Sequence, residues 1–234
     1  MQINSFELFH TNSLNAEEVN DFCRVYIWHH AYSQEELSEF AQTSSKSKCS
    51  SKRSAEKLSI LLMVRQLLGP TFKLQHRPSG RPFLQAESRP VPFISISHSH
   101  GAYALSLSSR PHGIDIEKID EKVFHLRSRF LSDSELRLVD ILPSVMQSQF
   151  AETSSQLIQK VSAATLLWSA KEAAFKAFQS DALQTISQIA LAIDKGNHLI
   201  ACFEPAKLQG TIHFELLSDF ILTSCESLQT EKKV

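Results

Sequence analysis

One helix-forming segment strongly limits how this chain can fold. The stretch TLLWSAKEAAFKAF, residues 165–178, carries apolar side chains over well over half of its circumference when wound at about 100° per residue. A helix of this kind must be largely buried. Ser169, Glu172 and Lys176 share the narrow polar strip that remains, which is either a surface with an i, i+4 ion pair or the wall of a cleft.

A lysine also falls within the apolar arc of this helix. Lys171 lies between Phe175 and Phe178 on the helical wheel. Because a buried, unpaired ammonium group is costly, we expect Lys171 either to extend to solvent along its methylene stem or to meet an anion.

The pentapeptide GIDIE, residues 113–117, has the alternation of a strand. Ile114 and Ile116 then share one face and are expected to anchor the strand in the core of the second half, whereas Asp115 and Glu117 share the other face. Their backbone positions lie about 6.6 Å apart, so the two carboxylates can converge on one cation. Oxygen ligands suit Mg²⁺ or Mn²⁺, but an isolated pair of this type is more often a solvated acidic face.

The remaining chain alternates between helices and short strands. Strands are predicted at 25–28, 93–97, 103–107, 114–117, 189–193, 199–203, 211–216 and 220–225. Helices are predicted after Ser33 with Glu36 in a capping box, over 55–68, from Ser132 with Glu135 to about 142, and over 165–179. The Ser- and Gln-rich stretch 143–162 is predicted to be a loop with at most a short helix. This mixture favours an α+β fold with antiparallel sheets over a doubly wound parallel sheet.

Composition excludes several classes of function. The net charge of −1 gives no general reason to expect nucleic acid as a partner. The sequence has no apolar run of about 18 residues and no basic-then-apolar leader, so we expect a cytoplasmic protein without a membrane segment. Cys23, Cys49, Cys202 and Cys225 have no CxxC spacing and are expected to be free thiols. Neither G-x-G-x-x-G nor G-x-x-x-x-G-K-[ST] is present.

Two further groups of residues could bind an anion. His98 stands between Ser97 and Ser99 beside a tight turn at Gly101, although a single histidine at a strand end is usually structural. A hydrolase would need a nucleophile elbow such as G-x-S-x-G, which the sequence lacks. The basic residues, which are either solvated or able to clamp a polyanion, are Lys46, Lys48, Lys52, Arg53, Lys57 and, in a Gly/Pro turn, Arg81.

The ordered motifs SGRPFL, FISISHS, GIDIE and WSAKEAAFK together resemble those of one family. The chain resembles the 4′-phosphopantetheinyl transferases of the long, pseudo-dimeric type that activates surfactin synthetase. The resemblance is strong over 78–178 and weaker over 25–68 and in the last strands. Ser95 stands where the family frequently has Asn, and the Ser/Gln-rich segment looks longer than usual.

The resemblance implies an α+β fold of two similar halves related by pseudo-twofold symmetry, each a small antiparallel sheet packed with helices. Residues 1–111 would form the N-terminal half, which holds the phosphate and adenine side of coenzyme A. Residues 112–234 would form the C-terminal half, which holds the metal and the catalytic carboxylates. The protein would be a cytoplasmic monomer.

The activity implied is transfer of the 4′-phosphopantetheine arm of coenzyme A to a serine of an apo acyl or peptidyl carrier protein or domain, with release of adenosine 3′,5′-bisphosphate. The pathway would be fatty-acid, polyketide or nonribosomal-peptide biosynthesis. Asp115, Glu117 and Glu172 would bind Mg²⁺, or Mn²⁺, together with the pyrophosphate. Glu172 would take the serine proton directly or through a metal-bound water, and Lys176 would contact the phosphate or leaving-group oxygen.

The resemblance also implies a set of residues that bind coenzyme A, namely Arg53, Arg81, Pro82, Ser97, His98 and Lys176. His98 would hydrogen-bond a phosphate, and Arg81 would line the adenosine-phosphate side. The residue that holds the 3′-phosphate stays open among Lys46, Lys48, Arg53 and Lys57. Trp168 is expected to be a packing residue, and no role is assigned to Lys171.

Two other functions remain open at this point. A Mg²⁺-dependent phosphoesterase or nuclease could use the same carboxylates and would hydrolyse its substrate without a carrier protein. A non-catalytic protein could bind coenzyme A or a carrier. The WSAKEAAFK helix and the SHS strand argue against the first, and the intact set of Asp115, Glu117, Glu172 and Lys176 argues against the second.

Overall fold

The structure is a computed structural model that describes residues 4–6, 23–29, 32–43, 52–86, 91–145, 155–178 and 180–229. Its strands are β1 (Asn4–Phe6), β2 (Cys23–His29), β3 (Lys73–His76), β4 (Pro82–Gln85), β5 (Phe93–Ser99), β6 (Ala102–Ser108), β7 (His112–Lys118), β8 (Ala190–Ile193), β9 (Leu199–Phe203), β10 (Leu208–Leu217), β11 (Phe220–Glu226) and β12 (Leu228–Gln229). Its α-helices are α1 (Gln34–Thr43), α2 (Lys52–Leu68), α3 (Glu121–Leu126), α4 (Asp133–Leu136), α5 (Leu138–Val145) and α7 (Gln156–Ala177). The 3₁₀ helices are η1 (Arg127–Arg129), η2 (Ile186–Gln188) and η3 (Glu204–Ala206).

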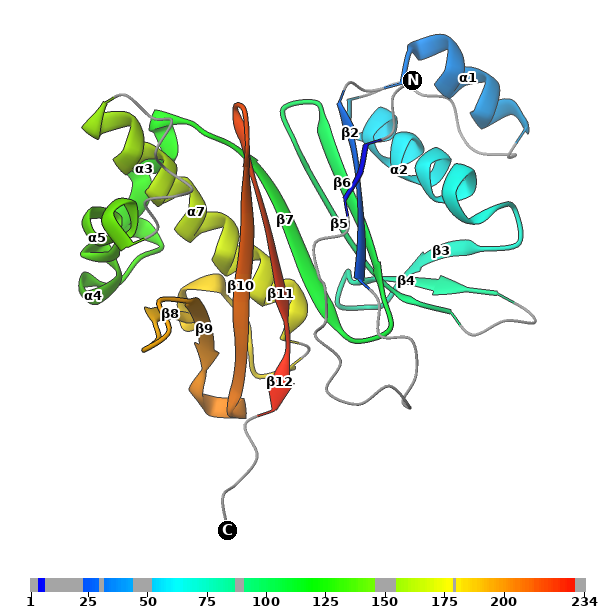
Figure 1. Cartoon of the computed structure of the whole chain (residues 1–234). Helices are drawn as coiled ribbons and strands as arrows, with labels where there is room; N and C mark the ends of the chain where they lie inside the picture. Colours follow the sequence, from blue (N-terminus) through cyan, green and yellow to red (C-terminus); the bar gives the residue numbers. More distant parts are fainter. Residues whose placement is uncertain are drawn as a thin grey trace.

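Two sheets pack against each other between two layers of helices (Figure 1). The four-stranded sheet has the order β1-β2-β6-β5 and is covered by α1 and α2. The six-stranded sheet has the order β7-β11-β10-β9-β8, with β12 also paired to β10, and is covered by α7. The β3-β4 hairpin forms a separate two-stranded sheet. The strand pairs are antiparallel, so the expected α+β fold with antiparallel sheets is confirmed.

The β5-β6 hairpin is closed by a two-residue turn. His100 and Gly101 both have positive φ, at 47° and 85°, as a type I′ turn requires. This turn follows the SHS motif directly and fixes the register in which Ser97 pairs with Ala104 and His98 with Tyr103. Alternate residues of β5 therefore face opposite sides of the four-stranded sheet.

The isoleucines of GIDIE pack between the two sheets. Ile114 and Ile116 are fully buried against Val25 and Ile27 of β2 and against small residues of β6. The prediction that they anchor the strand in the core of the second half is therefore wrong, because they belong to a separate cluster between the two sheets. Helix α7 packs against one face of β7, so the other, apolar face of β7 packs against the four-stranded sheet.

Helix α7 begins earlier than the apolar pattern suggests. The prediction of a loop over 143–162 is wrong at both ends, because α5 continues through Pro143 to Val145 and α7 starts at Gln156, while 146–154 lie outside the described residues. Ser155 caps α7 by accepting a hydrogen bond from the backbone N–H of Ile158. Burial from Val161 onward stabilises a helix that the Ser/Gln composition alone does not indicate.

Most other elements match their predictions. All eight predicted strands are present with bounds shifted by a few residues, and both capping boxes, Ser33 with Glu36 and Ser132 with Glu135, are formed. The helix predicted after Ser132 is divided at Arg137 into α4 and α5. Strands β1, β3, β4 and β12 and helix α3 were not predicted, because they are short and lack a clear apolar period.

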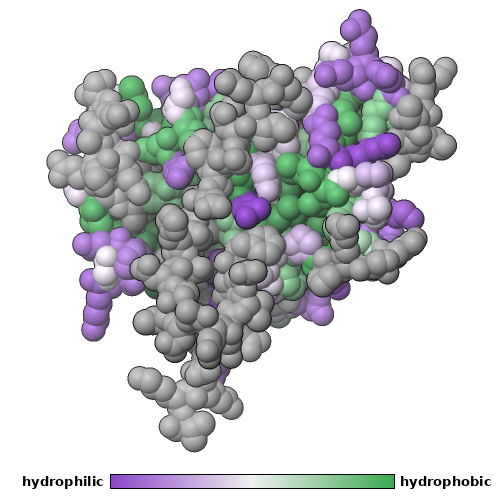
Figure 2. Space-filling view, turned by 45° about the vertical axis from the view of Figure 1, so that its right-hand side comes forward, coloured by the Kyte–Doolittle hydropathy of each residue, from purple (hydrophilic) through white to green (hydrophobic). Residues whose placement is uncertain are grey.

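Three of the four cysteines fall in the described part of the chain. Cys23, Cys202 and Cys225 are free thiols there, as expected, and Cys49 lies outside the described residues. Within the described residues, no helix has the length and apolar character needed to cross a membrane. The face turned forward in Figure 2 mixes hydrophobic with hydrophilic side chains among the residues coloured there.

Gly113 is required where β7 passes beneath α7. A Cβ at this position would collide with the backbone oxygen of Ala173 and would lie 2.6 Å from the backbone nitrogen of Ala177. We expect Gly113→Ala to lower the free energy of unfolding by about 1–3 kcal/mol, because the helix must shift away from the strand. Urea denaturation measures this loss.

Gly196→Ala is the matched control. A Cβ there would meet chiefly the exposed ring of His198, which can move away, so its free energy of unfolding should change by less than about 0.5 kcal/mol. Equal stability of the two variants would contradict the close packing of β7 on α7.

Candidate active site

A cavity of about 1010 Å³ opens between the two halves of the chain. Its walls come from α2, the β3-β4 hairpin and β5 on one side, and from the C-terminal part of α7 and residues 180–184 on the other. This volume lies at the upper end of the usual range for small-molecule and cofactor sites. The cavity can therefore hold a large, extended ligand.

The polar strip of α7 faces this region and not bulk solvent. Glu172 and Lys176 line the cavity, and Ser169 is fully buried one turn earlier in the helix. Lys176 forms its ion pair with Asp115 of β7, not with Glu172. Of the two predicted interpretations of the strip, the cleft wall is correct.

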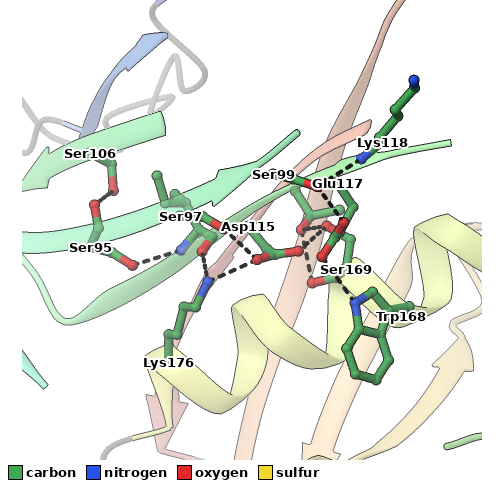
Figure 3. A network of polar contacts seen from close by, with 12 residues as sticks. Ser95, Ser97, Ser99, Ser106, Asp115, Glu117, Lys118, Trp168, Ser169 and Lys176 are labelled. Carbon is green, nitrogen blue, oxygen red and sulfur yellow. Dashed lines mark hydrogen bonds and ion pairs between the residues drawn. The ribbon is translucent and has the colours of Figure 1, made fainter. Parts of the chain in front are cut away.

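Asp115 is the most completely bound carboxylate of the group (Figure 3). Its Oδ1 accepts hydrogen bonds from Ser97 Oγ at 2.7 Å and from Lys176 Nζ at 2.8 Å. Its Oδ2 accepts one from Ser169 Oγ at 2.9 Å. With the side chain 4% exposed, these donors replace water around the charge.

Glu117, two residues further along β7, is held by two different donors. Its Oε2 accepts a hydrogen bond from Ser99 Oγ at 2.8 Å, and its Oε1 accepts one from Trp168 Nε1 at 3.3 Å. Burial and the negative charge of Asp115 raise the pKa of Glu117, while the hydrogen bonds from Ser99 and Trp168 oppose this rise. Trp168 packs edge-on against Phe130, as expected, but it also orients this carboxylate.

Glu172 has no hydrogen bond or ion pair to any described residue. Burial raises the pKa of its carboxyl group, the charge of Asp115 raises it further, Lys176 lowers it and Glu117 adds a smaller rise. Glu172 is therefore close enough to both other carboxylates to feel their charge. It is the carboxylate of the three that the fold leaves free to take a partner from outside.

Three serines of β5 join the four-stranded sheet to β7 (Figure 3). Ser95 Oγ accepts a hydrogen bond from the backbone N–H of Ile114 at 3.0 Å, Ser97 donates to Asp115, and Ser99 donates to Glu117. They occupy alternate positions and therefore share one face of β5. Ser97 was predicted to bind the cofactor; the structure places its buried hydroxyl against Asp115, and Ser97 is not among the residues that line the cavity.

The acidic residues do not form a closed metal cage as they stand. Within the described residues, no group of three or more His, Cys, Asp and Glu side chains is arranged to hold a metal ion. A carboxylate has about four acceptor positions, and the donors to Asp115 use three of them. Asp115 can therefore offer about one position to a cation, and Glu172 can offer both oxygens.

Four of the six residues predicted to bind coenzyme A line the cavity, namely Arg81, Pro82, His98 and Lys176. The centroid of the His98 ring lies 5.6 Å from that of the Tyr103 ring. The guanidinium of Arg81 also donates hydrogen bonds to the carbonyl oxygens of Phe178, at 3.0 Å, and Phe175, at 3.4 Å. Arg81 thus caps the C-terminus of α7 and ties the β3-β4 hairpin to that helix.

Further cationic residues line the same cavity. Lys57 is the member of the N-terminal basic cluster that the structure places there, together with His76 and Arg77 of the β3 end. The motifs gave no signal for His76 or Arg77, which lie outside them. Lys46 and Lys48 lie outside the described residues, and the side chains of Lys52 and Arg53 are not described.

His112 is a buried residue of the cavity wall that the sequence did not indicate as functional. Its Nε2 hydrogen-bonds with Ser106 Oγ, and its Nδ1 lies 3.2 Å from the carbonyl oxygen of Arg110. Burial lowers the pKa of His112 to about 4 against the opposing effect of the Arg110 carbonyl. The ring is therefore neutral at pH 7, with Nδ1–H donating to the carbonyl and Nε2 accepting from the serine.

Lys171 meets an anion inside the C-terminal half. Its Nζ lies 2.8 Å from Glu135 Oε1 and 2.7 Å from the carbonyl oxygen of Ile189, and the two side chains are 1% and 3% exposed. Glu135 also accepts a hydrogen bond from the backbone N–H of Leu191 and completes the Ser132 capping box. The lysine of the motif thus joins α7 to α4 and β8, away from the cavity.

A comparison with protein-family models matches residues 111–225 to the model ACPS, the 4′-phosphopantetheinyl transferase superfamily. Residues 111–225 are thus similar to a domain of this superfamily. The matched range contains Asp115, Glu117, Glu172 and Lys176, so it includes the acidic strand and the helix that faces it. The match supports phosphopantetheinyl transferase activity at the level of the superfamily. No curated protein matches the chain.

The superfamily match agrees with the arrangement of β7 and α7. The matched range covers β7, α3, α4, α5, α7 and most of the six-stranded sheet, and it ends within β11. The cavity, however, draws one of its walls from residues that precede the domain. A ligand in this cavity therefore contacts both the matched domain and the N-terminal half.

The buried Lys171–Glu135 pair generates a stability prediction. Lys171→Met would leave the Glu135 carboxylate buried without its cation and should lower the free energy of unfolding by about 3–5 kcal/mol. Adding Glu135→Gln to this variant removes the unpaired carboxylate and should restore a large part of the lost free energy of unfolding. Urea denaturation of the two single variants and the double variant measures the coupling. A cost below about 1 kcal/mol for Lys171→Met would contradict the burial of the pair.

Proposed function

We propose that this protein transfers the 4′-phosphopantetheine group of coenzyme A to a serine of an apo acyl or peptidyl carrier protein and releases adenosine 3′,5′-bisphosphate. The reaction would depend on Mg²⁺, with Mn²⁺ as a possible substitute. The protein would belong to the long, surfactin-synthetase-activating type, with halves at 1–111 and 112–234 related by pseudo-twofold symmetry. We expect it to act in the cytoplasm as a monomer, without nucleic acid or a membrane.

The shape and charge of the cavity carry this proposal. Glu172 and Lys176 stand at its wall beside the acidic strand, and Lys57, Arg77 and Arg81 stand around the rest of it. Coenzyme A carries a diphosphate and a separate 3′-phosphate, so it needs a large cavity with cations at more than one place. The superfamily match to residues 111–225 supports the same substrate.

The acidic residues fit a magnesium ion that arrives with the substrate. Mg²⁺ is usually bound by one or two carboxylates together with substrate phosphates and waters, and not by a complete protein cage. Glu172 and the remaining acceptor position of Asp115 are suited to this, with Glu117 as the third proposed ligand. When bound, the ion would supply positive charge that neutralises the diphosphate.

Glu172 is the proposed general base, directly or through a water. Its carboxyl group has a raised pKa because of burial and the nearby charge of Asp115, which makes it a stronger proton acceptor than an ordinary glutamate. It also lacks a hydrogen-bond partner among the described residues, so no internal donor competes for the incoming serine hydroxyl.

Lys176 would contact the phosphate or the leaving-group oxygen. In the structure its ammonium donates to Asp115 Oδ1 and to the carbonyl oxygen of Ile114, at 2.8 and 2.9 Å. The side chain is 27% exposed, so it also borders the cavity. Arg81, Pro82 and His98 would line the phosphate and adenosine side. Lys57 lines the cavity and is a candidate for binding the 3′-phosphate, and Arg53 is also proposed to bind coenzyme A.

The mass of a carrier protein tests the proposal directly. An apo acyl or peptidyl carrier protein incubated with the protein, coenzyme A and Mg²⁺ should gain the mass of one phosphopantetheine group, and adenosine 3′,5′-bisphosphate should accumulate in equal amount. The absence of a gain with several apo carriers would overturn the proposal. Hydrolysis of coenzyme A without a carrier would favour a phosphoesterase instead.

Glu172→Gln should separate activity from stability. Transfer should fall by about 10²–10⁴-fold, because the proposed base is lost. The raised pKa of Glu172 means that its ionisation opposes folding, so this cost appears as the pH rises through the folded pKa. The variant should therefore be more stable than wild type at neutral pH and equally stable below the ordinary pKa of glutamate.

Denaturant unfolding at several pH values, together with the carrier mass assay, measures both effects. Glu204, which is exposed and does not line the cavity, provides the control, and Glu204→Gln should change neither property. Normal transfer by Glu172→Gln would show that the base is misassigned.

A further inference from the structure

We propose that Ser169 and Thr223 are positioning residues that orient the Asp115 carboxylate for the cation of the reaction. This inference rests on the proposed function and extends it to two hydroxyl groups that do not line the cavity. It concerns the buried side of Asp115, opposite the side that receives Ser97 and Lys176.

The position of Thr223 follows from strand register. β11 pairs with β7 so that Thr223 lies directly opposite Asp115, and both side chains therefore stand on the same face of the sheet. α7 crosses this face and places Ser169 over the pair. Three segments that are far apart in the sequence thus converge on one carboxylate.

The hydroxyl groups form a short chain that ends on Asp115. Ser169 Oγ lies 2.9 Å from Asp115 Oδ2 and 2.8 Å from Thr223 Oγ1, and Thr223 Oγ1 lies 3.0 Å from the carbonyl oxygen of Ser169. Ser169 has one proton, and Asp115 as a carboxylate can only accept, so Ser169 donates to Asp115. Thr223 has one proton for two acceptors of the same residue, the carbonyl oxygen of Ser169 and Ser169 Oγ, so its hydroxyl holds Ser169 by a shared, three-centre contact.

Burial makes this arrangement rigid. Ser169 and Thr223 are each 0% exposed, and Asp115 is 3% exposed, so the chain is shielded from solvent. The bond to Oδ2 fixes the plane of the carboxylate from behind, while Oδ1 faces the ammonium of Lys176. A carboxylate held from behind keeps its free acceptor position in one direction, and partners of this kind are known to tune metal affinity.

Variants of β11 test the inference without touching a residue that contacts the substrate. Thr223→Val keeps the shape and removes the hydroxyl, whereas Thr223→Ser keeps the hydroxyl and removes a methyl group. Calorimetric titration with coenzyme A over a range of Mg²⁺ concentrations, without carrier protein, gives the half-saturating Mg²⁺ concentration for each. Thr223→Val should raise it about tenfold or more, and Thr223→Ser should leave it near the wild-type value.

Ser224→Ala provides a matched control on the same strand. The Ser224 hydroxyl is buried but has no hydrogen-bond partner among the described residues, and it stands on the opposite face of β11. Its removal should not change the Mg²⁺ dependence. Ser169→Ala should reproduce the effect of Thr223→Val, and denaturant unfolding should show that every variant compared is folded at the assay temperature.

The outcomes separate the two proposals. Equal Mg²⁺ dependence for wild type, Thr223→Val and Ser169→Ala would overturn the positioning role while leaving the transferase proposal standing. An equal rise for Thr223→Val and Thr223→Ser would also overturn it, because the effect would then follow packing and not the hydroxyl. A wild-type protein that neither binds coenzyme A nor modifies a carrier would overturn the proposed function, and the positioning role with it.

Discussion

The buried carboxylate of Asp115 connects the parts on which the site depends. It accepts hydrogen bonds from Ser97 of the four-stranded sheet and from Ser169 and Lys176 of α7, while its backbone belongs to the edge strand of the six-stranded sheet. A charge removed from water needs several good donors, and these come from elements that must be docked correctly to supply them. The same contacts that satisfy Asp115 therefore hold the two sheets and the helix in register.

The carboxylates around Asp115 outnumber the nearby cations, so the wall of the cavity carries an excess of negative charge. Lys176 is the cation whose charge lowers the pKa of both Glu117 and Glu172, whereas burial and neighbouring carboxylates raise both values. A fold selected only for stability would avoid such a group, because ionisation of each glutamate opposes folding. A cation that binds with the diphosphate would reduce the repulsion among these carboxylates. The electrostatic cost in the free protein is therefore consistent with the reaction that we propose.

The local patterns predicted much of the fold, and the long-range contacts explain what they missed. The apolar arc around α7 correctly indicated a buried helix, and the alternation of GIDIE correctly indicated a strand with two carboxylates on one face. Periodicity could not show that the Ser97 hydroxyl bonds to Asp115, or that Arg81 reaches carbonyl groups about 95 residues later, because both contacts depend on how distant segments pack. Lys171 shows an intermediate case: its need for an anion was evident, but Glu135 as the partner was not.

Diffraction can test most directly whether a divalent ion and coenzyme A meet at the carboxylates between the halves, as we propose. Crystals grown with coenzyme A and Mn²⁺ and measured for anomalous scattering would locate the ion. We predict one strong peak in contact with the diphosphate and with carboxylate oxygens of Asp115 and Glu172, and coenzyme A in the cavity lined by Lys57 and Arg81. Coenzyme A bound elsewhere, or an ion distant from these carboxylates, would contradict the account.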